Sequence, residues 1–560
     1  MCGIFALLNP QGIDESDIER EFIKGQKRGP EFSKLEKMFK ATLGFHRLAI
    51  NGLNDTSNQP IIINNVVLIC NGEIYNYKQL YKIMNITPKT QSDCEVIIHL
   101  FIKYGIEQTL VMLDGVFSFI LIDQRIKDND LDNYIYIARD PFGVRPLYTL
   151  ENDNDHYNIY NLYGFASELK CLEYFYNKNT YHYKIKQFQP GTYSIFKLDS
   201  KVQSKWKPYL TNEKYFVPTF SHSILMSNSN TNHYYEFYKN IAYYLNSSVI
   251  KRCEATERPV ACLLSGGLDS SLIAALVANY FRDHDKKIET YSIGLAESED
   301  VKYARIVADY IGSRHTEIIV SENDMFNAIP EVIEALESYD TTTIRASIGN
   351  YLIGKYIAAN SEAKVIFNGD GSDELLGGYL YMNKCPDDIE FDKETRRLLK
   401  DIHLFDVLRS DKSISSNGLE PRTPFLDKTF VNYVLSIPSY FRNHNNTKSG
   451  EKYLLRNAFK KINFKDSLNM QLLPDEILFR RKEAFSDGVS SQGRSLFQIL
   501  QQKAGEKLNM EPNIDTEKKY YKQIFDELYP NCSNILPYFW MPKYIESNDP
   551  SARTLMIYNE

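Results

Sequence analysis

The chain has 560 residues, of which 43% are hydrophobic and 24% charged, and its formal net charge is −7. This length predicts more than one domain, and the composition is typical of a globular protein. The acidic balance argues against nucleic-acid binding, and no apolar run approaches the ~18 residues of a membrane span. The N-terminus lacks the basic segment of a signal peptide. The eight cysteines are scattered without metal-ligand spacing, which favours reduced thiols and a cytoplasmic location.

The N-terminal part of the chain, from residue 2 to about 200, is rich in short strand-like runs. They cover residues 4–8, 61–70, 116–122 and 134–138, and turn signals such as Asn71-Gly72 separate them. Residues 94–103 carry apolar side chains at helical spacing. These patterns predict an α+β domain dominated by sheets.

Cys2 is the most informative residue of this part. Once Met1 is removed, Cys2 carries both a thiol and a free α-amine. Such an amine titrates near pH ~8 and can act as the general base for its own side chain. Most cysteines near a chain end have no such role. The functional interpretation therefore depends on three further features, at Arg47, Asn71-Gly72 and Asp93.

Each of these features also has a structural interpretation. Arg47 suits bidentate binding of a carboxylate. Asn71-Gly72 follows a strand-like run and could form an oxyanion hole, but Asn-Gly is also the strongest hairpin signal. Asp93 precedes a predicted helix, where it could bind a ligand or simply cap the helix.

Together with Cys2, these features resemble the class II glutamine amidotransferases, whose nucleophile is the N-terminal residue. Further motifs extend the resemblance over nearly all of residues 2–200: Lys27-Arg28-Gly29-Pro30 and the runs 138–148 and 165–170. The resemblance implies a sheet-sandwich fold of the N-terminal-nucleophile (Ntn) type. It implies that Cys2 attacks glutamine, and that the Asn71 side chain and the Gly72 N–H stabilise the oxyanion.

The same resemblance implies a glutamine-binding set. Its members are Arg47, Leu48, Ala49, Ile50, Asn51, Asn71, Gly72, Glu73 and Asp93. Arg47 is expected on the α-carboxylate of glutamine, and Glu73 and Asp93 on its α-ammonium. The chain departs from the family at Glu31, where Asp is usual, and at Asn51-Gly52, where Val-Asp is usual.

The second half of the chain begins with a polar stretch of weak periodicity, residues 201–235, which is predicted to be a linker. From residue 236 to 560, strand-like and helix-like segments alternate, and a C-terminal tail is expected from about residue 511. This alternation predicts an α/β domain with a largely parallel sheet, in which ligands bind at the carboxyl ends of the strands.

A glycine-rich turn, Ser265-Gly266-Gly267-Leu268-Asp269-Ser270, joins a predicted strand (260–263) to a predicted helix (272–277). Backbone N–H groups and the helix dipole make such a turn suited to anions. It has no lysine, so it is not the loop of kinases and GTPases. It resembles the pyrophosphate loop of ATP pyrophosphatases, which release AMP and pyrophosphate; the alternative is an ordinary strand-to-helix turn.

Three later clusters, 340–347, 368–379 and 480–488, combine hydroxyls, acids, glycines and cations. Singly, each could be a helix cap, an acidic loop or a basic surface. In this order, with the loop above and the runs 418–427, 538–543 and 549–554, they resemble the synthetase domain of the glutamine-hydrolysing asparagine synthetases. The implied fold is adenine-nucleotide α-hydrolase-like, and the implied reaction makes asparagine from aspartate through β-aspartyl-AMP.

This resemblance implies the remaining site residues. The expected ATP-binding residues are Leu264, Ser265, Gly266, Gly267, Asp269, Ser270, Ile293, Asn368, Gly369 and Lys482. Mg2+ is expected at Asp269 and Asp373. Thr342, Thr343 and Arg345 are expected in the pocket for aspartate and the intermediate.

The segment 368–374 departs from the family, which usually reads Ser-Gly-Glu-Gly-Ser-Asp-Glu. This chain has Asn368 for the Ser and Asp370 for the Glu, which the family uses to form or consume the adenylate. Asp is one methylene shorter, and a misplacement of ~1 Å can cost ~100-fold in rate. We expect Asp370 to keep the catalytic role.

Two other functions remain open from the sequence. One is glutamine-dependent amidation of another carboxylate, as in the related β-lactam-forming enzymes, although these tend to lose the cysteine. The other is a catalytically weakened binding protein, suggested only by Asp370 and Asn368. The sequence leaves a homodimer open.

Overall fold

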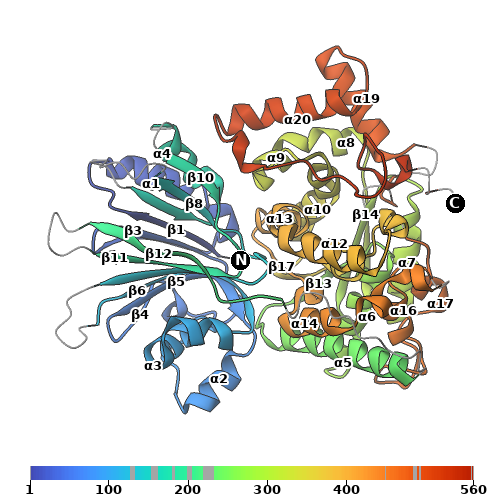
Figure 1. Ribbon diagram of the computed structural model, residues 1–560, viewed down its shortest axis with the longest axis horizontal. Helices are drawn as coiled ribbons and strands as arrows, with labels where there is room; N and C mark the ends of the chain where they lie inside the picture. Colours follow the sequence, from blue (N-terminus) through green and yellow to red (C-terminus); the bar gives the residue numbers. More distant parts are fainter. Residues whose placement is uncertain are drawn as a thin grey trace.

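The computed structural model describes residues 2–125, 133–152, 162–178, 183–198, 205–218, 232–447, 450–482, 488–490, 494–555 and 558. The N-terminal domain is a sandwich of two six-stranded antiparallel sheets (Figure 1). The first sheet has the order β10-β8-β9-β1-β3-β2 and the second β12-β11-β7-β6-β5-β4. The predicted Ntn-type sheet sandwich is therefore confirmed.

The strands of the two sheets have the following bounds. The first sheet consists of β1 (Gly3–Leu8), β2 (Phe32–Met38), β3 (Ala41–Arg47), β8 (Tyr148–Asn152), β9 (Tyr163–Ala166) and β10 (Tyr183–Gln187). The second consists of β4 (Ile61–Ile63), β5 (Val66–Ile74), β6 (Gly115–Asp123), β7 (Tyr134–Arg139), β11 (Thr192–Leu198) and β12 (Trp206–Lys214).

Alternation along the strands builds the core of this sandwich. Ile4, Ala6 and Leu8 of β1 pack in one buried cluster with Val67 and Ile69 of β5. The outer faces are covered by helices, α1 (Glu15–Ile23) and α4 (Glu173–Asn177) on the first sheet and α2 (Tyr77–Met84) and α3 (Glu95–Met112) on the second (Figure 1). Successive side chains of a strand point to opposite faces of its sheet. One face packs on the other sheet and the opposite face packs on helices, so apolar side chains occur on both faces.

Three details of this domain differ from the sequence-based prediction. The run 61–70 is two strands joined by a hairpin at Asn64-Asn65, both with positive φ. Asn-Gly at 71–72 is not a turn but lies inside β5. Helix α3 continues past residue 103 to Met112.

The predicted linker also needs correction. Residues 206–214 form β12, which pairs with β11 at the edge of the second sheet. An edge strand exposes much of its surface to solvent, so its residues are mostly polar. The alternation of apolar and polar residues that would indicate a strand is therefore weak in this segment. Residues 201–204 and 219–231 of the predicted linker lie outside the described residues.

The C-terminal domain is built on a five-stranded parallel sheet of order β15-β14-β13-β16-β17. Its strands are β13 (Val260–Leu263), β14 (Glu289–Gly294), β15 (Arg314–Ile319), β16 (Val365–Phe367) and β17 (Glu420–Arg422). The strand order reverses at β13, whose neighbours are β14 and β16. A crevice at the carboxyl end of β13 is the place where such sheets bind ligands. The predicted parallel-sheet architecture is confirmed.

Helices surround this sheet on both faces (Figure 1). Their bounds are α5 (Asn232–Glu254), α6 (Leu268–Arg282), α7 (Glu299–Ile311), α8 (Glu322–Asn327), α9 (Ile329–Leu336), α10 (Thr341–Asn360), α11 (Ser372–Leu376), α12 (Asp388–Asp401), α13 (Asp406–Ser415), α14 (Lys428–Ser436), α15 (Ser439–Arg442), α16 (Tyr453–Ala458), α17 (Asp475–Leu478), α19 (Leu496–Leu508) and α20 (Ile514–Leu528). The segment expected as a tail thus contains α20, which packs on α9 and α10. No helix among the described residues combines the length and apolarity that crossing a membrane requires.

Buried ion pairs join the two domains. Arg28 lies 2.8 Å from Asp411, and Arg145 lies 3.6 Å from Glu420. Lys412 of α13 pairs with Glu337, whose carboxylate also accepts from the backbone N–H groups of residues 169 and 170. Removing one member of a buried pair leaves an unpaired charge, which is strongly destabilising. The domains are therefore held in one fixed arrangement.

Candidate active sites

The Cys2 thiol lies where the two sheets of the N-terminal domain meet. Its Sγ is 3.7 Å from the carbonyl oxygen of Leu48, which follows β3. The backbone oxygen of Cys2 accepts a 3.1 Å hydrogen bond from the buried Arg28 side chain. Burial raises the pKa of the Cys2 thiol. The thiol therefore needs a base to become nucleophilic, which fits a cysteine that provides its own α-amine.

Asn71 is connected to the start of β1. Its side-chain amide donates to Ser167 Oγ at 3.3 Å, and Ser167 Oγ also accepts from the backbone N–H of Ile4 at 3.1 Å. Asn71 Oδ1 is buried and has no hydrogen-bond partner among the described residues. A Cβ at Gly72 would lie 2.5 Å from the Val116 carbonyl oxygen. Glycine is therefore needed here for close packing of β5 against β6.

Glu73 and Asp93 form an acidic end of this site. Glu73 accepts a 2.7 Å hydrogen bond from the Asn51 side chain, and Asp93 accepts one of 2.7 Å from the Ile74 N–H. Burial and the neighbouring Asp93 charge raise the pKa of Glu73, and burial raises that of Asp93 to about 6. A buried cation would stabilise both carboxylates. Asp93 is not the cap of α3, because the N-cap residue of that helix is Cys94, and no side chain caps the helix there.

Arg47 holds the loop that follows β3. Its guanidinium donates to the Asn54 carbonyl at 2.9 Å and to Asn58 Oδ1 at 2.7 Å, and it also contacts the carbonyls of Asn51 and Gly52. Its predicted contact with the glutamine carboxylate stays a prediction.

The segment 48–50 lies between the Cys2 site and the C-terminal domain. The Ala49 N–H donates to the Glu31 carboxylate at 2.7 Å, which gives the unusual Glu31 a structural role. Leu48 and Ile50 are buried in an apolar cluster that also contains Leu264 and Leu268 of the C-terminal domain. One apolar core therefore extends from the segment 48–50 to the glycine-rich turn.

If Asp93 binds the α-ammonium of glutamine, as the sequence predicts, that binding should weaken as the pH falls through about 6, the pKa to which burial raises Asp93. Below that pH Asp93 is neutral and cannot pair with the α-ammonium of glutamine. The KM for glutamine should rise about fourfold between pH 8 and pH 5.5. Glutamate release measured across this range checks it, and the Asp93→Asn variant should lack this component. A KM that is the same at both pH values would contradict the assignment.

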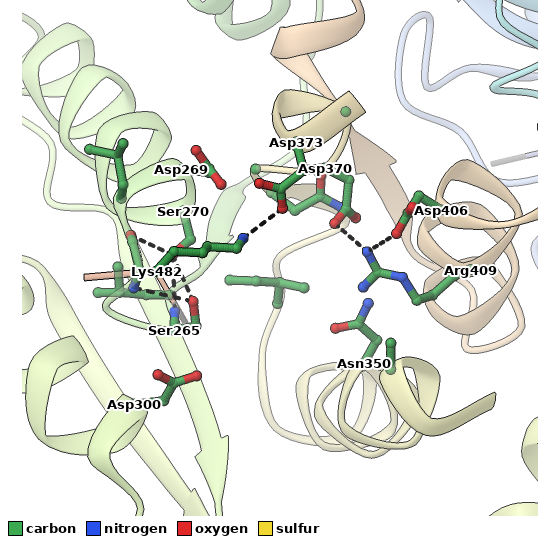
Figure 2. Close-up of a pocket in the computed structure, with 18 of the residues that line it drawn as sticks. Ser265, Asp269, Ser270, Asp300, Asn350, Asp370, Asp373, Asp406, Arg409 and Lys482 are labelled. Carbon is green, nitrogen blue, oxygen red and sulfur yellow. Dashed lines mark hydrogen bonds and ion pairs between the residues drawn. The ribbon is translucent and has the colours of Figure 1, made fainter. Parts of the chain in front are cut away.

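The C-terminal domain has a cavity of about 220 Å³ at the carboxyl ends of its parallel strands. Figure 2 shows Ser265, Asp269, Ser270 and Lys482 on one side and Asp370 and Arg409 on the other. The predicted residues that line it are Leu264, Ser265, Gly267, Asp269, Ser270, Ile293, Thr342, Thr343, Asn368, Gly369, Asp370, Asp373 and Lys482.

The glycine-rich turn forms a compact anion cradle. The hydroxyls of Ser265 and Ser270 lie 3.0 Å apart, and the Ser265 N–H donates to Ser270 Oγ. Gly266 does not line the cavity: its φ is 71°, and a Cβ there would lie 2.5 Å from the backbone of α7. Gly267 is the N-cap residue of α6, so the positive end of a 15-residue helix faces the cavity.

Two lysines and two aspartates surround this cradle. Lys452 Nζ is 2.6 Å from Asp269 and 2.5 Å from Asp373, and Lys482 Nζ is 2.6 Å from Asp373. Burial alone would raise the pKa of Asp373, but the two lysines hold it below its usual value. The site thus keeps two fixed cations beside the glycine-rich turn.

Asp269 and Asp373 also fit a magnesium ion that arrives with a nucleotide. Mg2+ is usually held by one or two carboxylates together with substrate phosphates. Among the described residues, no group of three or more His, Cys, Asp or Glu side chains is arranged to hold a metal. The donor set therefore fits a shared site and not a preformed protein cage.

Asp370 lies at the opposite end of the cavity. Its Oδ1 accepts a 2.8 Å hydrogen bond from Arg409, which also pairs with Asp406 at 2.7 Å. Oδ2 of Asp370 is buried without a hydrogen-bond partner among the described residues, and burial raises the pKa of this carboxyl. Asn368 donates to Ser410 of α13 at 2.6 Å. This hydrogen bond gives Asn368, which stands where the family usually has Ser, a structural role.

Arg345 does not line the cavity, so its predicted place in the aspartate pocket is wrong. Arg345 lies about one turn after Thr342 on α10, but its guanidinium donates hydrogen bonds to Glu517 and Asp549. Thr342 and Thr343 do line the cavity, and Asp340 caps the Thr343 N–H at 2.8 Å.

Several lining residues are absent from the sequence-based prediction. They include Asp300, Asn350, Arg409, Lys452 and Trp540. Lys452 is a single lysine before a short helix, and its local sequence contains no recognisable signal.

Comparisons with known proteins agree with this geometry. Residues 1–207 match the glutamine amidotransferase domain family, and residues 240–389 and 384–548 match the asparagine synthase family. A glutamine-hydrolysing asparagine synthetase of Gallus gallus is 41% identical over 589 positions, and its relatives from Cricetulus griseus and Homo sapiens are 39% and 38% identical over 590. Each alignment covers 100% of this chain and 99% of the relative. The chain therefore belongs to the glutamine-hydrolysing asparagine synthetases.

Proposed function

We infer that this protein makes L-asparagine from L-aspartate, consuming ATP and taking the nitrogen from the side-chain amide of L-glutamine. Its products are asparagine, glutamate, AMP and pyrophosphate. The observation that carries this inference is one chain with two sites: a half-buried Cys2 thiol in the domain that contains Asn71, and a cavity with an anion cradle at the end of a parallel sheet.

The glutaminase step begins at Cys2. Its thiol loses a proton to the α-amine and attacks the side-chain carbonyl of glutamine. The Asn71 amide and the Gly72 N–H stabilise the tetrahedral oxyanion, and each such donor contributes a few kcal/mol. Ammonia leaves, and water then hydrolyses the thioester to glutamate. Glu73 and Asp93 hold the substrate α-ammonium, while Arg47 binds its α-carboxylate and orders the loop around it.

The synthetase step takes place in the C-terminal cavity. The β-carboxylate of aspartate attacks the α-phosphorus of ATP, and pyrophosphate leaves toward the cradle of Ser265, Gly267 and Ser270. Lys452 and Lys482 neutralise the charge that develops on the departing phosphates. Mg2+ carried with ATP would be held by Asp269 and Asp373 and would supply further charge neutralisation. Ammonia then attacks the β-aspartyl-AMP, and AMP leaves.

Asp370 is placed to act on the acyl adenylate. Its unpartnered Oδ2 can accept a proton from the incoming ammonia, while Arg409 fixes the other oxygen. At neutral pH most free ammonia is protonated in bulk water, so it must pass between the sites through the protein interior. The apolar cluster shared by Leu48, Ile50 and Leu264 lies along the interface that it must cross.

Substrate choice tests this function directly. The protein is incubated with Mg-ATP, glutamine and one acid from a panel of aspartate, glutamate and N-carboxymethyl β-amino acids, and AMP and amide product are measured. We expect AMP and product with aspartate. Product with a different acid would support the alternative amidation reaction, and no AMP with any acid would support a binding protein.

Restoring the longer acid, Asp370→Glu, is expected to leave the rate of asparagine formation within about twofold of the wild type or to raise it. The added methylene moves the carboxylate toward the cavity, while Arg409, which is held by Asp406, remains in place to bind it. Asparagine formation with saturating ammonia measures the effect. A loss of tenfold or more would show that this pocket is rebuilt around the shorter acid.

A further inference from the structure

The Arg345 side chain ties together the two ends of the C-terminal segment. Its guanidinium binds Glu517 of α20 through bonds of 2.8 and 2.5 Å, and binds Asp549 through bonds of 2.7 and 2.9 Å. Arg345 and Glu517 are both buried. Two bidentate pairs on one guanidinium define both distance and orientation. Arg345 therefore fixes the chain on either side of residues 518–548 to α10.

Trp540 is the member of this segment that reaches the cavity. Its side chain is buried and lines the cavity wall. Its backbone N–H donates at 2.8 Å to Asp340 Oδ1, while Oδ2 of the same carboxylate caps Thr343. One buried carboxylate thus sets the position of Trp540 relative to the start of α10. In Figure 1 the red C-terminal segment crosses back over the domain from α20.

The Trp540 ring packs beside the Asp370 end of the cavity. Its centroid is 5.3 Å from that of Tyr379. The Tyr379 hydroxyl donates to Asp406 at 2.9 Å, and Asp406 pairs with Arg409, the partner of Asp370. The cradle for phosphates lies at the other end, with Ser265 and Ser270 (Figure 2). Trp540 therefore belongs to the end that is left for the amino-acid substrate.

We propose that the C-terminal segment 538–549 forms one wall of the aspartate subsite, with Trp540 as a specificity-determining residue and Arg345 as a positioning residue. The proposal rests on the aspartate-dependent reaction inferred above. Trp540 closes the pocket over the aspartate chain and keeps the subsite small. Arg345 touches no substrate and acts only by holding the segment that carries Trp540.

The first test compares two neighbouring aromatic residues. Trp540→Ala is expected to raise the KM for aspartate about tenfold or more, because a large aromatic wall of the subsite is lost. The KM for ATP and the ATP-independent glutaminase rate should change less than about twofold. Trp540→Phe should recover most of the aspartate affinity. Phe539→Ala is the matched control, since Phe539 packs on Tyr339 and does not line the cavity.

The second test is a double-mutant cycle. Arg345→Met should raise the aspartate KM in the same direction, and adding it to Trp540→Ala should increase that KM by less than about twofold, because both act through one wall. An aspartate KM unchanged in Trp540→Ala would overturn the proposal. So would an equal rise in Phe539→Ala, or effects of Arg345→Met and Trp540→Ala that simply multiply. Asparagine formation by the wild type in the same assay tests the underlying function separately.

Discussion

Replacing Cys2 by alanine is expected to abolish glutamine-dependent asparagine formation and to leave ammonia-dependent formation at the wild-type rate. The nucleophile is then absent, and loss of a covalent nucleophile costs about a thousandfold or more. The adenylation cavity is built from residues 263–540, and Cys2 contributes nothing to its lining. The two rates are measured as asparagine release, once with glutamine and once with ammonium chloride.

A matched control for this variant is Cys171→Ala. Cys171 is a buried cysteine of the same domain whose Sγ lies 3.9 Å from the carbonyl oxygen of Phe22. Both of its rates should stay near the wild type. If Cys2→Ala also lost ammonia-dependent synthesis, the assignment of the two half-reactions to two separate sites would be wrong.

Replacing Lys452 by methionine is expected to have the opposite effect: asparagine formation is lost and glutamine hydrolysis is kept. Lys452 is 3% exposed and lies within 2.6 Å of both Asp269 and Asp373. Without Lys452, the carboxylates of Asp269 and Asp373 would repel the phosphates of ATP. One of the two cations that neutralise the charge on the departing pyrophosphate would also be missing. Asparagine formation from either nitrogen source should fall about a hundredfold or more. Glutamine hydrolysis without ATP should continue, which also shows that the variant is folded.

Lys461→Met provides the comparison, because Lys461 is an exposed lysine of the same domain. It should have no measurable effect on either rate. Asparagine formation by Lys452→Met within about fivefold of the wild type would remove Lys452 from the catalytic machinery.

The parts of the sites that are formed by neighbouring residues could be predicted from the sequence. The segment 265–270 joins β13 to α6 as expected, although α6 already begins at Leu268, and all its predicted ATP-binding residues except Gly266 line the cavity. The side chain of Asn71 is linked through Ser167 to the backbone of Ile4, two residues from Cys2, but glycine is needed at position 72 for a reason that the sequence does not predict. A side chain at position 72 would clash with the backbone of β6. This contact between strands cannot be inferred from the local sequence.

The parts that depend on contacts across the chain could not be predicted. Lys452 is 183 residues from Asp269, and Arg345 is 204 residues from Asp549. An arginine after two threonines resembles a substrate-binding residue when it is viewed locally. Its actual partners are identified only when the C-terminal segment packs on α10. The same holds for β12, whose pairing with β11 cannot be inferred from its polar sequence.

Ammonia made at Cys2 should be consumed in the C-terminal cavity of the same chain. An isotope experiment checks this: the protein is supplied with glutamine labelled with 15N in its side-chain amide, together with an excess of unlabelled ammonium, Mg-ATP and aspartate. Mass spectrometry then gives the fraction of asparagine that carries the label. We expect this fraction to be far above the isotope ratio of the bulk ammonium. A labelled fraction equal to that ratio would show that ammonia leaves to the solvent between the two sites.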